Sequence, residues 1–168
     1  MRDNRFAPAT ATVAQGRTVA FTNFGRVVHD ARDGTGLDLF ATELLGPPET
    51  ESVGPLPGAG DYRYYCTFHP EMVGSLRVPV RTSRTQVRED ARVTVRWAAV
   101  RPPAGLVFDV QRRRPGADRF VDWRVGAIAA AAVFRPSERG LWTIRARVRQ
   151  AVGDASSGWS PVRAIRIT

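Results

Sequence analysis

Turn-forming and β-branched residues recur along this sequence at short intervals, and that spacing limits what the chain can fold into. Proline, glycine and β-branched residues recur every eight to twelve positions, and no stretch keeps a helical apolar period over three turns. Such spacing is typical of short strands joined by tight turns. The sequence therefore predicts an all-β protein with few helices.

Apolar and polar residues alternate in two series of strand candidates, one in each half of the chain. The expected strands cover residues 10–13, 17–23, 62–66, 74–80, 93–97, 107–113 and 142–149. Between the two series, residues 81–86 (RTSRTQ) are polar and lack large apolar side chains. Such composition is typical of a linker. We therefore expect a first domain over residues 1–80, a linker over 81–86 and a second domain over 87–168.

The charge is distributed unevenly along the 168 residues. Residues 1–80 carry seven arginines and nine acidic residues, whereas residues 81–168 carry eighteen arginines and seven acidic residues, and the chain has a net charge of +9. All 25 basic residues are arginine, which is more consistent with a coding bias than with selection for phosphate contacts. We therefore do not expect nucleic acid as a partner, since no groove-reading element or RNA-binding signature accompanies the charge.

Membrane insertion is not expected either. The longest apolar run, residues 127–134, has eight residues, whereas a membrane-spanning helix needs about 20. The first residues, MRDNRF, contain no apolar stretch of the kind found in export signals. The chain is then either cytosolic or a mature or trimmed form of an exported protein.

A short segment after the strand at residues 62–66 concentrates metal-binding chemistry. Cys66, His69 and Met72 follow one another at intervals of three, and alternation along the strand points Tyr62, Tyr64 and Cys66 the same way. Thiolate, thioether and imidazole donors together select copper, and a plane of two histidines and one cysteine with a weak axial methionine describes a blue-copper centre. The plane then lacks one imidazole, and His29 is the only other histidine.

Each of these residues also has an ordinary structural interpretation. A lone cysteine is usually a small buried hydrophobic residue, a single loop histidine usually lies at the surface, and Met72 would serve as core filler. The joint pattern is rarely accidental, and Pro70 and Gly74 suit a tight, preorganised loop. The residues themselves therefore favour a metal site.

The first half also resembles the plastocyanin and azurin family of cupredoxins, particularly its amicyanin-like members with the shortest ligand loop. The resemblance rests on residues 6–8 (FAP), 13–23 (VAQGRTVAFTN), 28–29 (VH), 60–72 (GDYRYYCTFHPEM) and 74–78 (GSLRV). It implies a Greek-key β-sandwich or barrel and one type 1 copper ion held by His29, Cys66, His69 and Met72. It also implies that His69 is the electron port, with Phe68, Pro70 and Met72 as an apolar docking rim.

One position departs from the family pattern, which usually has asparagine after the first histidine. Here that residue is Asp30. An ionised carboxylate only accepts hydrogen bonds. We expect Asp30 to accept one from a backbone N–H near Thr67, and its negative charge to favour Cu(II) and lower the reduction potential. A solvent-facing Asp30 is the alternative.

The second half resembles a fibronectin type III domain, a smaller immunoglobulin-like β-sandwich. The resemblance rests on residues 93–97 (VTVRW), 107–111 (VFDVQ), 140–149 (GLWTIRARVR) and 158–161 (GWSP). Trp142 stands where the family usually has a corner tyrosine, whose hydroxyl makes a hydrogen bond to the backbone upstream. The tryptophan puts that hydrogen bond in doubt. Arg145, Arg147 and Arg149 project from one strand face, where Trp159 or Trp123 would stack between their guanidinium planes.

Two functions from different classes follow. The first is an exported, periplasmic or extracellular, non-enzymatic copper protein that transfers electrons to or from a redox protein, since no histidines remain for a second copper centre. The second is a surface binding or adhesion module in which the first domain stores copper or serves as a scaffold. In that case the arginine-rich domain recognises an anionic partner such as a cell-wall polymer, a membrane surface or an acidic redox protein.

Overall fold

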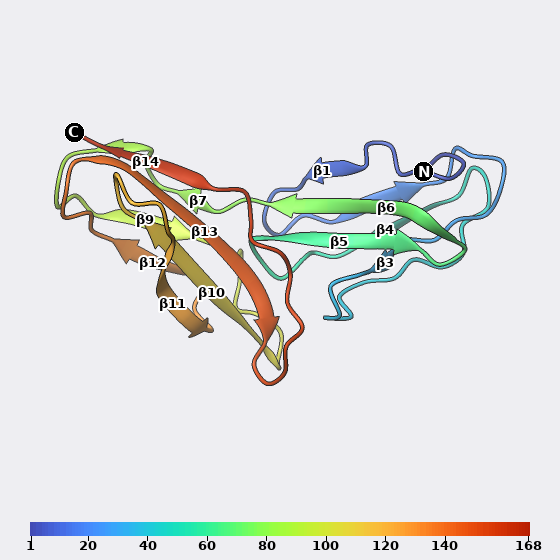
Figure 1. Ribbon diagram of the computed structural model, residues 1–168. Coiled ribbons are helices and arrows are strands. Elements are labelled where there is room, and N and C mark those ends of the chain that lie inside the picture. The colour runs from blue at the N-terminus through green and yellow to red at the C-terminus, as the bar shows by residue number, and fades with distance from the viewer.

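The computed structural model describes all 168 residues, and every regular element in it is a β-strand (Figure 1). The strands number 14 and fall into four sheets. The all-β fold class expected from the sequence is therefore confirmed. No helix in the structure has the length and apolar character needed to cross a membrane.

The first half of the chain builds two sheets that enclose an aromatic core. The larger sheet has the strand order β1 (Thr10–Thr12), β6 (His69–Val78), β5 (Gly60–Cys66), β3 (Arg32–Asp33), and the smaller pairs β2 (Val19–Thr22) with β4 (Thr50–Val53). The sheets meet through Phe21 of β2 and Tyr64 of β5, whose ring centroids lie 5.3 Å apart. Phe6 and Phe40 complete this cluster of rings.

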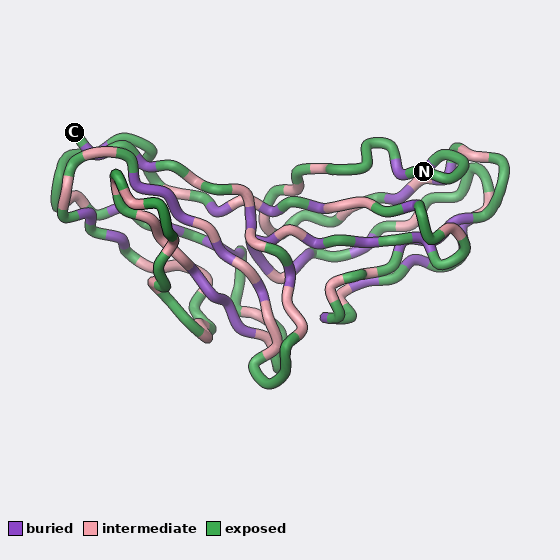
Figure 2. Tube along the Cα trace, viewed as in Figure 1, coloured by how far each residue is buried: buried purple, intermediate pink, exposed green.

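Strand β5 shows why the donor residues face inward. Buried residues alternate along it with half-buried or exposed ones, because successive side chains of a strand point to opposite faces. Tyr62, Tyr64 and Cys66 are all buried, as the alternation predicted. Figure 2 shows buried segments that alternate with more exposed ones along this strand. The thiol therefore ends a row of side chains directed into the core.

The second half forms another pair of sheets. One has the order β11 (Val121–Ala127), β10 (Leu106–Arg113), β13 (Gly140–Gln150), β14 (Arg163–Ile167), β8 (Gln86–Val87), and the other has the order β12 (Ala131–Phe134), β9 (Val93–Arg96), β7 (Arg81–Thr82). Trp97, fully buried beyond the end of β9, donates from Nε1 to the carbonyl of Ala129 at 2.7 Å. Trp142 donates from Nε1 to the carbonyl of Glu138 at 3.1 Å, so this position keeps an upstream hydrogen bond despite the missing tyrosine.

Residues 81–86, expected as a linker, differ from that expectation. Strand β7 pairs with β9, and Gln86 opens β8, which pairs in parallel with β14. The segment belongs to the second pair of sheets because its backbone hydrogen bonds are made there, which composition alone does not reveal.

The arginines of β13 are held on the outer face of their sheet. Trp159 lies under the guanidinium groups of Arg145 and Arg147, at 4.6 and 4.7 Å from its centroid. Arg149 instead binds Asp109, as Arg147 also does. The predicted stacking is confirmed for Trp159, whereas the Trp123 ring packs edge-on against Trp97 and Phe134.

The two halves meet at a packed junction near the centre of Figure 1. The N–H of Ala59 donates to the carbonyl of Trp97 at 2.6 Å, and Asp61 and Gly158 exchange two backbone hydrogen bonds. Gly58 lies so close to Phe108 that an added Cβ would come within 2.6 Å of its ring. One continuous cluster of 31 buried hydrophobic residues includes members of both halves.

The buried Asp109 makes stability depend on pH. Burial alone raises its pKa, but the hydrogen bonds from the Gly126 N–H, Arg147 and Arg149 outweigh burial and hold the pKa below the usual value. Its contribution is therefore complete above about pH 4 and is lost as the pH falls through the lowered pKa. We expect Asp109→Asn to cost about 2–3 kcal/mol at pH 7 and to flatten the loss of stability between about pH 5 and pH 2 in urea unfolding.

The exposed Asp122, also on this sheet, provides the control, because Asp122→Asn should leave the acid dependence unchanged. Equal acid dependence in the Asp109→Asn variant and the unmodified protein would contradict the assignment.

Candidate metal centre

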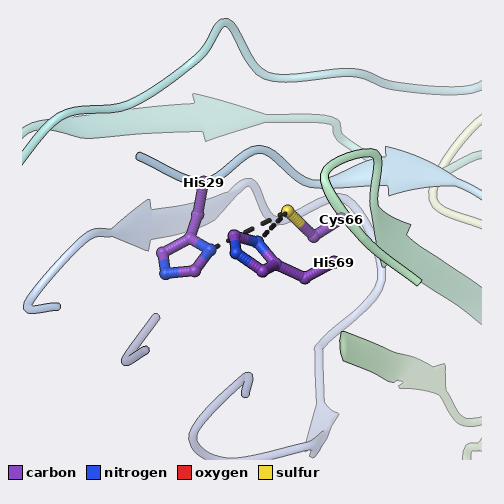
Figure 3. Close-up of side chains that lie close together, drawn as sticks. All are labelled: His29, Cys66 and His69. Atoms are coloured by element: carbon purple, nitrogen blue, oxygen red, sulfur yellow. Dashed lines mark hydrogen bonds between the residues drawn. The ribbon is translucent and has the colours of Figure 1, made fainter. Parts of the chain in front are cut away.

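Three donor atoms converge at the end of the first sandwich that lies away from the junction. The Cys66 Sγ lies 3.8 Å from Nδ1 of His29 and 3.5 Å from Nδ1 of His69. The ligand atoms all lie within 4.8 Å of one another. Figure 3 shows both imidazoles turned toward the sulfur. The structure thus brings together three of the four predicted ligands.

A two-residue turn sets the spacing of Cys66 and His69. Thr67 and Phe68 form the turn, and Cys66 faces His69 across the β5–β6 pair. The strand expected to begin at Gly74 therefore begins at His69 instead. The segment expected as a loop is mostly strand, because the ladder continues past a register shift beside Cys66.

His29 lies in a separate segment of the chain and pairs with Leu45. The two residues exchange backbone hydrogen bonds of 3.1 and 2.8 Å. The fully buried Asn23 holds the segment that leads to His29 in place, because its Nδ2 donates to the carbonyls of Val27 and Leu45, each at 2.8 Å. The N–H of Gly25 donates to the Asn23 side chain at 2.9 Å.

Asp30 connects the His29 segment to the turn after Cys66. Thr67 donates its N–H to Oδ1 and its hydroxyl to Oδ2 of Asp30, both at 2.7 Å. The predicted hydrogen bond is confirmed, and the solvent-facing alternative is excluded because Asp30 is buried. Arg32 adds a 2.9 Å ion pair. Burial raises the pKa of Asp30, but the bonds from Thr67 and Arg32 outweigh it and hold the pKa below its usual value.

The environment of His29 favours a neutral imidazole. Burial first, and the neighbouring His69 second, lower its pKa, although Asp3 acts in the opposite direction. A neutral imidazole keeps a lone pair on one nitrogen. The Nε2 atom is buried without a hydrogen-bond partner and faces Oδ1 of Asp3 at 3.8 Å. A proton on Nε2 is favoured by this carboxylate, which leaves the free lone pair on Nδ1, the nitrogen that faces Cys66.

The two sulfur-to-nitrogen separations fit a trigonal metal site. Metal–nitrogen and metal–sulfur distances of about 2.0 and 2.3 Å, at angles of about 120°, separate the two donors by about 3.7 Å. The observed separations of 3.5 and 3.8 Å lie on either side of that value. Two imidazoles and a thiolate are the planar donor set of a blue-copper centre.

Met72 and the two rim residues occupy different environments. Met72 lies in β6, three residues beyond His69, and is 1% exposed. It therefore cannot form part of a docking rim, and the sequence-based expectation of that role was wrong. Phe68 is 59% exposed and Pro70 is exposed, whereas His69 is partly buried. The surface beside His69 thus presents two accessible apolar side chains.

Further exposed apolar side chains lie near the ligands along the chain. Phe24, Val27 and Val28 precede His29, and Leu44 precedes its pairing partner.

Asp3, Asn23 and Arg32 also support the site, and the sequence analysis did not identify them. Asp3 and Asn23 are far from Cys66 in sequence, so no spacing rule points to them, whereas Arg32 carries only the signal of a basic residue two positions after Asp30.

Comparisons with known proteins give partial matches. No protein-family model and no curated protein matches the chain. Among solved structures, a novel purple cupredoxin from Nitrosopumilus maritimus is 31% identical, with 43% of this chain and 79% of that chain covered, at a TM-score of 0.39.

Two further solved structures match different shares of the chain. The Cu-containing nitrite reductase of Thermus scotoductus SA-01 is 32% identical over 45% of this chain and 20% of that chain, with a TM-score of 0.40. The FN1-FN3 domains of chicken CNTN1 are 13% identical over 90% of this chain and 61% of that chain, with a TM-score of 0.36. This chain therefore spans a fifth of the nitrite reductase and about three fifths of the CNTN1 structure.

Asn23 provides a test of how the His29 segment is held. Asn23→Ala removes the side-chain donor of the Val27 carbonyl and the acceptor of the Gly25 N–H, and it leaves the Leu45 carbonyl with the His29 N–H as its donor. We therefore expect a loss of about 2–4 kcal/mol in the free energy of unfolding. We also expect weaker Cu(II) binding, because His29 is no longer held against Cys66. Urea unfolding and a copper titration measure the two effects.

Thr50→Val is the control, since it removes one exposed hydrogen bond to Thr22 and should cost about 0.5 kcal/mol or less. An Asn23→Ala variant as stable as this control would show that the segment is held by other contacts.

Proposed function

We propose that the first sandwich binds one copper ion in a mononuclear type 1 site and that the protein is an electron carrier. The observation that carries the proposal is the contact of Cys66 Sγ with both histidine Nδ1 atoms. When bound, the copper supplies a one-electron couple between Cu(I) and Cu(II). His29, Cys66 and His69 would hold the ion, with Met72 as a fourth ligand.

Burial of the ligands keeps water from the site. His29 and Cys66 are fully buried and Met72 nearly so. When thiolate and imidazole donors are buried, bulk water does not compete with them for the ion. Bulk water also does not rearrange around the ion when its charge changes. The low exposure of these three residues therefore favours a carrier in which the ligands move little when the charge changes.

The hydrogen bonds around Asp30 restrain the ligands in the same way. Two bonds from Thr67 to Asp30 connect the segments that carry His29 and Cys66, and Arg32 holds the same carboxylate in an ion pair. Outer contacts of this kind orient metal ligands. A restrained ligand geometry lowers the reorganisation that accompanies electron transfer, which supports a redox role over storage.

His69 and the apolar surface beside it favour contact with a redox protein. His69 is the least buried donor, and Phe68 and Pro70 next to it are exposed. Small apolar surfaces suit brief encounters between redox proteins, which bury little area. We therefore propose His69 as the electron port and a redox protein as the partner, with no bond made to a substrate.

We further propose that the protein is a carrier and not an enzyme, and that it acts outside the cytoplasm. Both histidines of the sequence belong to the one cluster, so a second copper centre rich in histidine has no ligands in this chain. An unprotected thiol in an oxidising compartment is liable to modification, whereas a metal-bound thiolate is protected. Export with the metal loaded is consistent with Cys66 as a ligand.

Copper titration tests the central proposal. We expect an intense visible thiolate-to-copper band that saturates at about one equivalent of Cu(II), followed by reversible reduction and oxidation. Cys66→Ser should abolish the band without unfolding the protein, because the hydroxyl is close to the thiol in size. A folded, reduced protein without the band would exclude the electron carrier and favour the surface binding module.

The charge of Asp30 gives a second prediction. A nearby negative charge favours Cu(II), so Asp30→Asn should raise the reduction potential, by an amount on the order of tens of millivolts. Arg32→Gln should shift the potential in the opposite direction, because it removes the positive partner of the same carboxylate. Voltammetry of the copper-loaded protein measures both shifts.

Asp118→Asn makes the same change of charge at an exposed position of the second sandwich and should leave the potential unchanged. Shifts of Asp30→Asn and Arg32→Gln in the same direction would show that a change in structure, and not charge, controls the potential.

A further inference from the structure

The second sandwich holds a polar hollow built around two unpaired arginines. Its lining consists of Arg81, Thr82, Ser83, Thr94 and Arg96, with no hydrophobic and no acidic residue among them, and its volume is about 250 Å³. We propose that this hollow, here named the β7–β9 site, binds a tetrahedral oxyanion, that is, a phosphate or sulfate group. The proposal does not depend on the copper site.

The strand register places two like charges face to face. Arg81 of β7 is the direct cross-strand partner of Arg96 of β9 in an antiparallel pair. Side chains so placed have Cβ atoms about 4.5–5.5 Å apart, and like charges at such positions are destabilising. An anion between the two guanidinium groups converts this repulsion into two attractions.

No carboxylate of the protein neutralises the pair. The ion pairs of the structure use Asp30, Asp61, Glu89 and Asp109 for other arginines, besides the contact of Asp3 with His29. Arg96 reaches only the carbonyl of Ala98, at a long 3.5 Å. The guanidinium groups of the β7–β9 site therefore keep most of their donors free, unlike those of Arg145 and Arg147, which stack on Trp159.

Hydroxyl groups add donors to the same hollow. The N–H of Thr94 donates to the Ser83 hydroxyl at 3.0 Å, and Arg163 donates from Nε to the Thr82 hydroxyl at 3.2 Å. Because each oxygen accepts from the protein, each hydroxyl hydrogen is free to donate elsewhere.

The arrangement of these donors favours a tetrahedral group over a planar one. Arginine forks bind phosphate in a bidentate manner, and two forks with added hydroxyls approach from two neighbouring strands. The oxygens of a tetrahedral anion point in three dimensions and accept hydrogen bonds from all of these donors. The two coplanar oxygens of a carboxylate reach fewer of them. The backbone bond from Ser83 to Thr94 at 2.9 Å and the β7–β9 ladder fix the donors on rigid elements.

Titration of the whole chain with inorganic phosphate, at constant ionic strength in chloride, tests the proposal. We expect saturable NMR shifts at the side-chain Nε–H groups of Arg81 and Arg96, and a phosphate-dependent rise in Tm. Sulfate should act like phosphate, whereas acetate should bind at least about tenfold more weakly. A phosphate monoester that binds as well as inorganic phosphate identifies the ester as the natural form, whereas its exclusion identifies the free ion.

Substitutions separate a specific site from general charge. Arg81→Gln and Arg96→Gln should each weaken phosphate binding at least about tenfold while leaving the Tm in phosphate-free buffer equal or higher, because each relieves repulsion. Arg135→Gln removes the same charge at an exposed position and should leave the affinity unchanged. Absence of saturation up to roughly 50 mM phosphate, or equal weakening by Arg135→Gln, would overturn the proposal.

Discussion

The buried carboxylate of Asp30 holds together the two chain segments on which the donor cluster depends. His29 and Cys66 lie far apart in sequence, and their neighbours are linked by the pair of hydrogen bonds from Thr67 to Asp30, beside the β3–β5 pairing of Arg32 with Tyr65. Both bonds are short, and the carboxylate is nearly inaccessible to water. Because charge-assisted bonds in such surroundings are strong, this contact fixes the relation of the two segments before any metal binds.

The donor residues themselves were predictable because their signal is local. Alternation along residues 62–66 placed Cys66 on the inner face, and the spacing to His69 follows from one tight turn. His29 followed from scarcity, since the chain has only one other histidine. The acceptor role of Asp30 was predictable from its position beside His29. The axial role of Met72 stays a prediction, and the structure shows only that the residue is buried.

The supporting residues were not predictable, because their partners are non-local. Asp3 faces His29 through a turn at the start of the chain, and Asn23 bonds across to Leu45. A sequence carries no spacing rule for such contacts. The assignment of residues 81–86 as a linker shows the same limit, since a polar segment becomes strand when neighbouring backbones offer hydrogen bonds. The domain boundaries stay a prediction.

Strand β5 relates the metal centre to the junction of the two halves. Near its beginning, Asp61 pairs with Gly158 and the Tyr62 hydroxyl donates to the carbonyl of Gly58, whereas its last residue is Cys66. Six residue steps of extended chain, about 20 Å, separate the two ends of the strand, and Figure 1 shows β5 running away from the junction. The second sandwich thus leaves the surface around His69 free. The electron-transfer partner proposed for that end and the oxyanion proposed for the β7–β9 site would therefore not compete for space, because β7 and β9 belong to the second sandwich.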